Sequence, residues 1–306
     1  NNSFADKVFF CNSGAEANEA AIKLARKYSH DRGNAGRSEI ITMEGSFHGR
    51  TMATLSATGQ KRFHNGFEPM LPGFRYVPFN DAGALEKAVT GATCAVMLEP
   101  IQGEGGVNCP SPDYLKQVRG ICDRAGLLLI FDEVQVGMGR TGRLFAYEHY
   151  GIAPDIMTLA KGLGGGIPIG AMLGTDKIAP SFSPGTHAST FGGNPLSTAA
   201  GIATLGILLK DGFLETCEKR GRYFFDGLTA LMKKHPVITD VRGKGLILAM
   251  ELEREGADVV TRCMDQGVLL NCTMDRVLRF IPPLTITEQE IDIALKVLDQ
   301  SLSVPG

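Results

Sequence analysis

Short apolar runs, rich in Leu, Ile and Val and bounded by glycine or proline, recur along the first two thirds of the chain. Such runs are typical of strands that are buried on both faces of a parallel sheet. Segments with helical spacing separate them, and the first places Ala17, Ala20, Ala21 and Leu24 on one face. This alternation predicts an α/β fold, with a mostly parallel sheet covered by helices on both sides. The predicted strands are 7–12, 38–45, 92–100, 127–132 and 156–160, and the predicted helices are 13–33, 82–90 and 113–126.

The last third of the chain has a different pattern. One long helical stretch from Pro195 to about Lys234 leads into a strand pair, a helix, two further strands and a final helix. Thr287 and Glu290 match a capping box at the start of the final helix. We therefore expect a large domain over residues 1–212 and a small α+β domain over residues 213–306. The predicted elements of the small domain are the strand pair within 235–252, the helix 256–267, the strands 268–273 and 277–283, and the helix 287–302.

Composition narrows the class of protein. The chain has 306 residues, 43% hydrophobic and 21% charged, with a net charge of −2, so it can fold as one large and one smaller domain. Near-neutral charge gives no electrostatic reason to expect nucleic acid or an anionic membrane as partner. The longest apolar stretches are too short to cross a bilayer. Seven scattered cysteines without a CxxC pair argue against a disulfide framework and a zinc site, and we expect no metal.

A carboxylate and an amine follow two neighbouring predicted strands. Asp132 ends the run LLLIFD, and Lys161 follows the run IMTLA and precedes a row of glycines. In open α/β sheets, ligands bind outside the carboxyl ends of the strands, so both side chains are expected in one crevice. An acid and an amine held there suit a cofactor with a pyridine ring and an aldehyde. The alternative is that Lys161 is a solvated lysine at a strand end.

Other loops carry candidate binding groups. Residues 13–16 (SGAE) match a capping box, so they predict a helix start that can also bind a phosphate on its free amides. In the loop 47–50 (FHGR), Phe47 can stack on a flat ring and Arg50 can grip a carboxylate. A core phenylalanine and a surface arginine are the plainer interpretations.

Two glutamates, Glu99 and Glu104, follow the predicted strand 92–100. Arg279, in the segment RFIPP, is the natural partner for one of them or for a substrate carboxylate. The alternative is a pair of loop carboxylates without a role in binding.

A dinucleotide-binding loop is the main rival interpretation. Residues 137–142 spell GMGRTG, and Asp155 lies at a suitable spacing for a ribose contact. This would make the chain an NAD-dependent dehydrogenase. However, that fingerprint should follow its strand directly, whereas Asp132, Glu133 and Gln135 stand between the apolar run and the first glycine. No clear amphipathic helix begins inside the glycines either.

Together these segments resemble the class III, ornithine-type, pyridoxal-phosphate (PLP) aminotransferases of fold type I, in particular the acetylornithine branch. The resemblance covers essentially the whole chain and rests on seven motifs in a shared order. The motifs are SGAEANEAA, SFHGRT, EPIQGEGG, DEVQVGMGRTG, LAKGLGGGIPIGAML, STFGGNP and RFIPP.

The resemblance implies roles for the residues around the cofactor ring. Lys161 is expected to form the Schiff base with PLP, and Asp132 to pair with the pyridine nitrogen. Gln135 is expected to bond the ring hydroxyl, while Val134 and Phe47 sandwich the ring. His48, also expected at the cofactor, stands where ornithine δ-aminotransferases usually carry Trp, and this favours the acetylornithine branch.

The resemblance also implies a phosphate site, a substrate site and a dimer. Ser13, Gly14 and Ala15 resemble the phosphate cradle, and Thr190 resembles the phosphate ligand that the neighbouring subunit of a homodimer supplies. Arg50 resembles the clamp for the substrate α-carboxylate. Glu104 and Arg279 resemble the pair that lets one pocket accept an amine donor first and 2-oxoglutarate second.

The implied reaction transfers the δ-amino group of N-acetylornithine to 2-oxoglutarate. Ornithine, succinylornithine, 4-aminobutyrate or lysine as donor remain alternatives. The resemblance further implies that an N-terminal segment of the family is missing from this chain, and we expect no leader in its first residues. The resemblance implies a soluble enzyme, in the cytoplasm if bacterial and in the plastid or mitochondrial matrix if eukaryotic.

Overall fold

The computed structural model describes residues 2–304, and the chain divides into two compact units. Two short segments, 101–109 and 139–144, belong to the second unit although they follow strands of the first. The domain boundary expected at residue 213 stays a prediction. The first unit comprises Asn1–Pro100, Pro110–Met138 and Phe145–Ile207, and the second comprises Ile101–Cys109, Gly139–Leu144 and Leu208–Gly306.

A seven-stranded sheet forms the first unit, in the order β1-β7-β6-β5-β4-β2-β3. Strand β7 pairs antiparallel with β1 and with β6, while the ladders from β6 to β3 are parallel. The predicted mostly parallel α/β sheet is therefore confirmed. The strands are β1 (Lys7–Cys11), β2 (Glu39–Met43), β3 (Phe74–Val77), β4 (Thr93–Leu98), β5 (Leu128–Asp132), β6 (Ile156–Leu159) and β7 (Gly170–Gly174).

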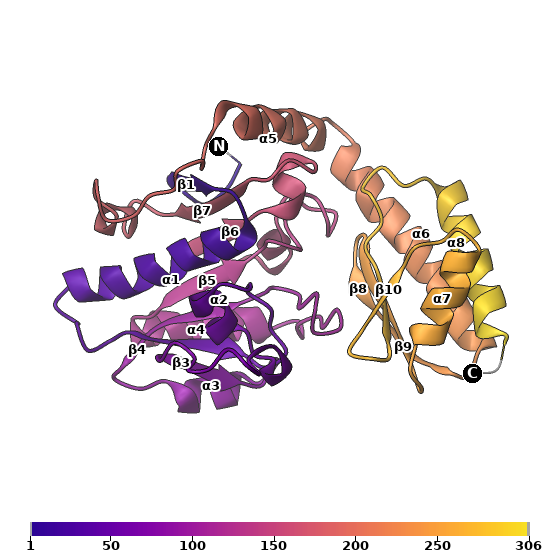
Figure 1. Cartoon of the computed structure of the whole chain (residues 1–306), viewed down its shortest axis with the longest axis horizontal. Helices are drawn as coiled ribbons and strands as arrows, with labels where there is room; N and C mark the ends of the chain where they lie inside the picture. The colour runs from indigo at the N-terminus through magenta and orange to yellow at the C-terminus, as the bar shows by residue number, and fades with distance from the viewer. Residues whose placement is uncertain (1, 305–306) are drawn as a thin grey trace. The chain divides into compact units, whose positions relative to one another are not determined.

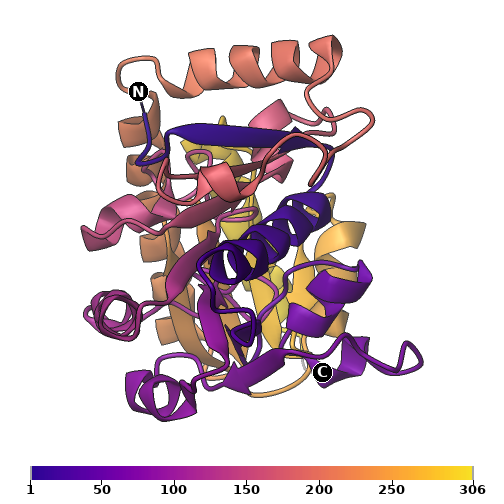
Figure 2. The same cartoon turned by 90° about the vertical axis from the view of Figure 1, so that its left-hand side faces the viewer.

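The centre of this sheet is covered on both faces. Every residue of β4, β5 and β6 is buried, and successive side chains of a strand point to opposite faces. Helix α1 (Gly14–Asp31) crosses one face, as Figures 1 and 2 show, and packs its alanines, Ile22 and Leu24 on Ile130 and Ile156. The other helices of this part are α2 (Met52–Ala57), α3 (Ala82–Ala88) and α4 (Tyr114–Ala125).

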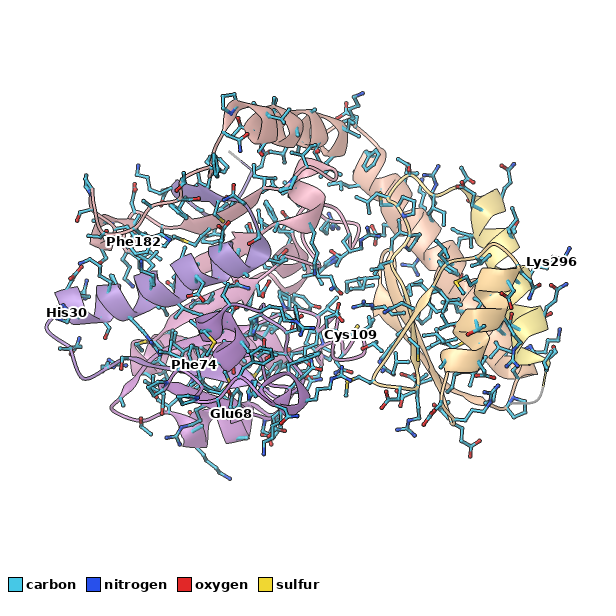
Figure 3. The ribbon with its side chains drawn as sticks, viewed as in Figure 1. His30, Glu68, Phe74, Cys109, Phe182 and Lys296 are labelled. Carbon is cyan, nitrogen blue, oxygen red and sulfur yellow. The ribbon has the colours of Figure 1, made fainter. Side chains whose placement is uncertain are left out.

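Phe74 and Phe182, both labelled in Figure 3, lie at the margin of the same core. Helix α4 ends at Gly126, whose φ of +63° is a left-handed conformation that glycine adopts without strain. Four short 3₁₀ helices complete the first unit. They are η1 (Lys61–Phe63), η2 (Ala146–Tyr150), η3 (Lys161–Gly164) and η4 (Ala179–Ser181).

The prediction of one long helix from Pro195 to Lys234 is wrong. The structure has two helices, α5 (Pro195–Leu208) and α6 (Phe213–Lys234). Gly212 precedes α6 with a φ of +80°, which is incompatible with a continuous right-handed helix. Among residues 2–304, no single helix has the length and apolar character needed to cross a bilayer; α5 and α6 meet those criteria only when they are counted together across their break.

The second unit contains a four-stranded antiparallel sheet in the order β10-β11-β9-β8. Its core joins this sheet to α6, α7 and α8 through residues such as Phe224, Leu248, Leu278 and Leu298. The capping box of Thr287 and Glu290 is confirmed, because each side chain accepts the other's backbone N–H. The remaining elements are β8 (Ile238–Lys244), β9 (Ile247–Leu252), α7 (Ala257–Asp265), β10 (Asn271–Thr273), β11 (Val277–Phe280) and α8 (Glu288–Leu302).

Candidate active site

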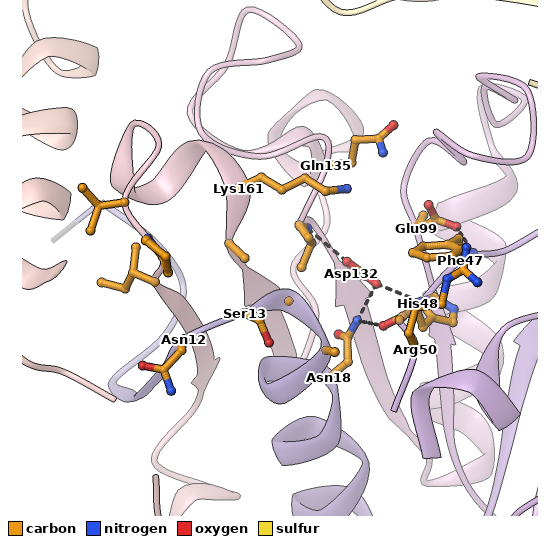
Figure 4. Close-up of a pocket in the computed structure, with 18 of the residues that line it drawn as sticks. Asn12, Ser13, Asn18, Phe47, His48, Arg50, Glu99, Asp132, Gln135 and Lys161 are labelled. Atoms are coloured by element: carbon orange, nitrogen blue, oxygen red, sulfur yellow. Dashed lines mark hydrogen bonds and ion pairs between the residues drawn. The ribbon is translucent and has the colours of Figure 1, made fainter. Parts of the chain in front are cut away.

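A cavity of about 480 Å³ lies in the first unit, at the carboxyl ends of three adjacent strands. Glu99 follows β4, Asp132 ends β5 and Lys161 follows β6, and all three residues line the cavity (Figure 4). This is where open parallel sheets bind ligands, and the volume is within the range of small-molecule sites. The other lining residues are Asn12, Ser13, Gly14, Ala15, Asn18, Phe47, His48, Gly49, Arg50, Val134, Gln135, Ala160 and residues 166–169.

Asp132 is a buried carboxylate with three hydrogen-bond donors. Its Oδ2 accepts from Asn18 Nδ2 at 2.7 Å and from His48 Nδ1 at 2.8 Å, and its Oδ1 accepts from the Val134 amide at 3.0 Å. The side chain is 3% exposed. Because an ionised carboxylate only accepts, His48 carries its proton on Nδ1. A carboxylate has about four acceptor positions, so one position remains for a ligand N–H.

Lys161 begins the 3₁₀ helix η3 with a φ of +42°. A left-handed conformation is strained for a residue with a Cβ, and such strain is concentrated at functional sites. Its side chain is exposed in this structure and lines the same cavity as Asp132. The expected meeting of acid and amine in one crevice is therefore present.

The start of α1 offers backbone amides to the cavity. Ser13 caps the helix, since its Oγ accepts from the Glu16 amide at 3.2 Å. The predicted reciprocal half of the capping box is wrong, because the Glu16 carboxylate accepts from the amide of Asn12 instead. The first amides of a helix have no carbonyl partner inside it, which leaves Gly14 and Ala15 to bind an anion.

Gly14 is required by close packing rather than by a turn. A Cβ at this position would lie 2.7 Å from Val134 Cγ1. The start of α1 and the loop after β5 thus approach each other too closely for any larger residue. Gly49, on the loop after β2, is also closely packed, since its Cβ would lie 2.6 Å from Thr54 Oγ1, and its φ of +139° favours glycine as well. Both glycines therefore allow the chain to pack closely beside the cavity.

Phe47 and Arg50 lie at the cavity with defined contacts. The Phe47 amide donates to Glu99 Oε2 at 3.0 Å, and its ring meets Phe63 edge to face. The Arg50 guanidinium lies 4.3 Å from the centroid of Phe63 and is exposed. A stacked guanidinium keeps its in-plane donors available for a carboxylate. Gln135 and Val134 line the cavity as well, so the expected ring contacts are brought together here.

Glu99 is the second buried carboxyl group of the cavity, with 4% exposure. Burial raises the pKa of Glu99 above its usual range, and the nearby charge of Asp132 acts in the same direction. The charges of His48 and Lys161 oppose these effects without cancelling them. The residue pattern alone did not distinguish Glu99 from Glu104, because both follow the same strand, whereas the family resemblance indicated Glu104 as the partner of Arg279.

Glu104 and Arg279 form an ion pair in the second unit. Arg279 Nη1 donates to Glu104 Oε1 at 2.8 Å, and Arg279 Nε donates to Asn271 Oδ1 at 3.1 Å. Arg279 is 7% exposed, so its charge depends on these acceptors. The expected pairing of Arg279 with one of the two glutamates is thus present. Neither residue lines the cavity described above.

Thr190 is exposed and does not line the cavity of Asp132 and Lys161. It lines a separate hollow of about 420 Å³ with Asn12, Glu16 and His187. Its expected role at a neighbouring subunit's site stays a prediction.

The GxGxxG loop does not form a dinucleotide site. Residues 137–142 form turns, and no α-helix begins within or directly after them. Asp155 instead accepts from Arg119 and from the Leu129 amide, both at 2.8 Å. The alternative of an NAD-dependent dehydrogenase lacks the helix N-terminus that would bind the pyrophosphate.

Comparison with known proteins points in one direction. The sequence model for Aminotransferase class-III matches residues 1–302. An acetylornithine aminotransferase of Caldanaerobacter subterraneus subsp. tengcongensis is 58% identical over 303 residues, which are 99% of this chain and 77% of that protein.

Two solved structures share the fold. One is an ornithine aminotransferase of Toxoplasma gondii with partial occupancy of PLP at its active site. Its TM-score is 0.93 at 39% identity, over 97% of this chain and 72% of that chain. The other is an N-acetylornithine aminotransferase of Stenotrophomonas maltophilia K279a, with a TM-score of 0.84 at 40% identity, over 98% of this chain and 75% of that chain.

Proposed function

Since the chain belongs to the class-III aminotransferase family, we propose that it is a PLP-dependent acetylornithine aminotransferase. It transfers the δ-amino group of N-acetylornithine to 2-oxoglutarate. The observation that carries the substrate assignment is the 58% identity, over 99% of the chain, to a protein with that activity in its name. Predictions of the family, the fold type and the cofactor from the sequence are confirmed.

The residues of the cavity fit PLP. Asp132 presents a buried carboxylate with one acceptor position left, which matches a protonated pyridine nitrogen. The amides of Gly14 and Ala15 match the phosphate, and the narrow approach of Gly14 to Val134 matches a flat ring. Bound there, PLP supplies an electron-withdrawing ring that stabilises negative charge on the substrate carbon.

Within the proposed reaction, Lys161 and Asp132 have different tasks. Lys161 Nζ would hold PLP when the cofactor is bound, and its amine would serve as the base that moves the proton of the substrate carbon. Asp132 Oδ1 holds the ring proton in place throughout. Gln135 would donate to the ring hydroxyl, while Phe47 and Val134 would pack against the ring.

The carboxylates of the proposed substrates would be bound by cationic side chains. We assign Arg50 to the α-carboxylate, because its stacking on Phe63 holds the guanidinium while its edge stays exposed. Arg279 is assigned to the second carboxylate of 2-oxoglutarate, with Glu104 as its partner when that carboxylate is absent. Because Arg279 pairs either with Glu104 or with the substrate carboxylate, its buried charge is compensated in both cases.

A homodimer is part of the proposal, with Thr190 serving the phosphate site of the neighbouring subunit. Large apolar side chains around Thr190 and on α5 support it: Phe191, Leu196 and Ile202 are 70–72% exposed. Exposed apolar side chains gathered on one segment are typical of subunit interfaces.

Mixing inactive variants tests the shared site. Lys161→Ala chains and Thr190→Ala chains, unfolded and refolded together, are expected to regain activity, because a mixed dimer has one site with both residues. Activity equal to the sum of the separate variants would contradict the shared site.

The donor assignment is tested by the visible spectrum of the protein loaded with PLP. N-acetylornithine is expected to bleach the cofactor band fastest, with 2-oxoglutarate restoring it. A higher kcat/KM for ornithine, succinylornithine, 4-aminobutyrate or lysine would overturn the donor assignment while leaving the aminotransferase assignment intact. The expected compartment stays a prediction.

A further inference from the structure

Asn18 is a buried amide on the apolar face of α1, with 1% exposure. It makes three hydrogen bonds, all at 2.7 Å. Nδ2 donates to Asp132 Oδ2 and to the backbone oxygen of His48, and Oδ1 accepts from Thr158 Oγ1. Figure 4 shows the amide between Asp132 and the loop that carries His48. Four segments are therefore joined at one side chain: α1, the loop after β2, β5 and β6.

We propose that Asn18 is a positioning residue, which holds the Asp132 carboxylate in the orientation that binds the pyridine nitrogen of PLP. This role rests on the proposed function, and it acts through Asp132 rather than by contact with the substrate. It adds Asn18, and Thr158 behind it, to the residues that determine cofactor binding.

The amide can point in only one direction. In the flipped orientation, Asn18 Oδ1 would face Asp132 Oδ2 and the His48 carbonyl oxygen, which are acceptors without a proton to offer. The Thr158 hydroxyl donates to Oδ1 and so stabilises the observed orientation. Both amide hydrogens are thereby directed at Asp132 and at His48, and no other rotation of the side chain satisfies all three partners.

This arrangement determines which oxygen of Asp132 faces the cofactor. Asn18 and His48 both donate to Oδ2, whereas Oδ1 receives only the Val134 amide. The remaining acceptor position is therefore on Oδ1. Hydrogen bonds to an ionised carboxylate also favour its ionised form in a buried site. Without Asn18, the carboxylate loses a donor on Oδ2 and can rotate.

A purely structural role makes a different prediction. A buried amide that only joins α1 to the sheet affects the stability of the apoprotein and leaves the bound cofactor unchanged. A positioning role affects the affinity for PLP and the pH dependence of the bound cofactor's visible band.

Three variants separate these roles. Asn18→Leu keeps the volume and removes all three hydrogen bonds. Thr158→Val keeps the shape of a fully buried residue and removes only the donor behind Asn18. Ser29→Ala is the control, since Ser29 is a buried polar residue near the other end of α1, bonded to the carbonyl of Asn34.

The readouts are the Kd of the apoprotein for PLP, by absorbance titration, the pH midpoint of the visible band, and the apoprotein Tm. Asn18→Leu is expected to weaken PLP binding roughly tenfold to a hundredfold, as for loss of a hydrogen bond to a charged group. The midpoint is expected to move by about half a pH unit or more. Thr158→Val is expected to weaken binding less than about tenfold, in the same direction, and Ser29→Ala is expected to leave both unchanged.

Wild-type Kd and midpoint in Asn18→Leu would overturn the proposal, whatever the change in Tm. If Asn18→Leu does not fold, Thr158→Val provides the test. A wild-type Kd for PLP and a wild-type pH midpoint in Thr158→Val would then overturn the proposal. An unaltered chain that binds no PLP would instead overturn the proposed function together with this inference.

Discussion

Asp132 and Lys161 follow neighbouring parallel strands, β5 and β6, and both line one cavity. The ladder places Asp132 opposite Thr158, and Leu159 and Ala160 carry the chain from there to Lys161. The positions of the acid and the amine thus follow from the sheet, since Asp132 ends β5 and Lys161 lies just after β6. This relationship is the structural basis of the proposed PLP chemistry.

Replacement of Asp132 by Asn should slow the half-reaction with N-acetylornithine strongly. The variant cannot hold a charged pyridine nitrogen, and its own Nδ2 would oppose the donors Asn18 and His48. Breaking a buried ion pair costs about 3–5 kcal/mol, so we expect a loss of roughly a hundredfold or more in rate. Stopped-flow bleaching of the cofactor band measures it. Asp155→Asn, which removes the partner of Arg119 outside the cavity, should leave that rate unchanged.

Gly14→Ala should weaken PLP binding, whereas Gly36→Ala should not. The new methyl group would lie 2.7 Å from Val134 Cγ1 and displace either the amides of α1 or the side chain above the ring. Overpacking of this kind typically costs about 1–3 kcal/mol, or roughly a fivefold to hundredfold rise in Kd. Gly36→Ala is the matched control, since its Cβ would have no neighbour within 4 Å. Equal Kd values for the two variants would contradict the cradle.

Glu104→Gln should change the ratio of the KM values for N-acetylornithine and 2-oxoglutarate. Without the carboxylate, Arg279 loses its partner at 2.8 Å and becomes available to a dicarboxylate at all times. We expect the ratio of KM values to shift several-fold in favour of 2-oxoglutarate, equivalent to about 1 kcal/mol. Separate half-reactions measure each KM. Arg254→Gln is the control, since it breaks the ion pair between Arg254 and Asp258 of α7. A shift of the same size in the ratio of KM values of this control would refute the role of Glu104.

Glu133 makes stability depend on pH. Its carboxylate accepts from the amides of Ala146 at 2.6 Å and Tyr147 at 2.7 Å, yet burial raises the pKa of Glu133 from 4.5 to about 8. The folded chain therefore holds this proton more tightly than the unfolded chain. Its stabilising contribution is complete below pH about 4.5 and is lost as the pH rises to about 8.

Glu133→Gln should remove that dependence. Thermal unfolding between pH 5 and 9 should show a smaller decline in Tm for the variant, although the variant is less stable at pH 5 because it loses one acceptor. The difference amounts to a few kcal/mol at most. Glu86→Gln, at an exposed ion pair, should keep the decline of the unaltered chain. If Tm declined with pH as steeply in Glu133→Gln as in the unaltered chain, the raised pKa of Glu133 would not be the cause of that decline.

The sequence predicted those helices and strands whose burial produces a regular spacing of apolar residues. Strands β4, β5 and β6 are buried on both faces and are therefore continuous apolar runs, and α1 has alanines at helical spacing. Strand β7 was not predicted, because it begins and ends with glycine and lies in a glycine-rich segment. The break between α5 and α6 was also missed, since apolar residues continue across it to Leu209 and only Gly212 marks the change.

The site was predictable only in part. Strand ends indicated Asp132 and Lys161, because the carboxyl ends of parallel strands meet at one edge of a sheet. Asn18 gave no such signal: a single polar residue on an apolar helix face has no sequence pattern, and its partners are 114 and 140 residues away. The pairing of Arg279 with Glu104 rather than Glu99 was indicated by the family resemblance alone, because the residue pattern does not distinguish the two glutamates and the contact forms only on folding.

Reductive trapping tests most directly whether Lys161 is the lysine that binds PLP. The protein is loaded with PLP, treated with borohydride to make the bond between cofactor and lysine permanent, and digested for peptide mapping. We expect one modified peptide, with the cofactor on Lys161, and no stable adduct in Lys161→Ala. A modified peptide that contains another lysine, or no adduct at all in the unaltered chain, would contradict it.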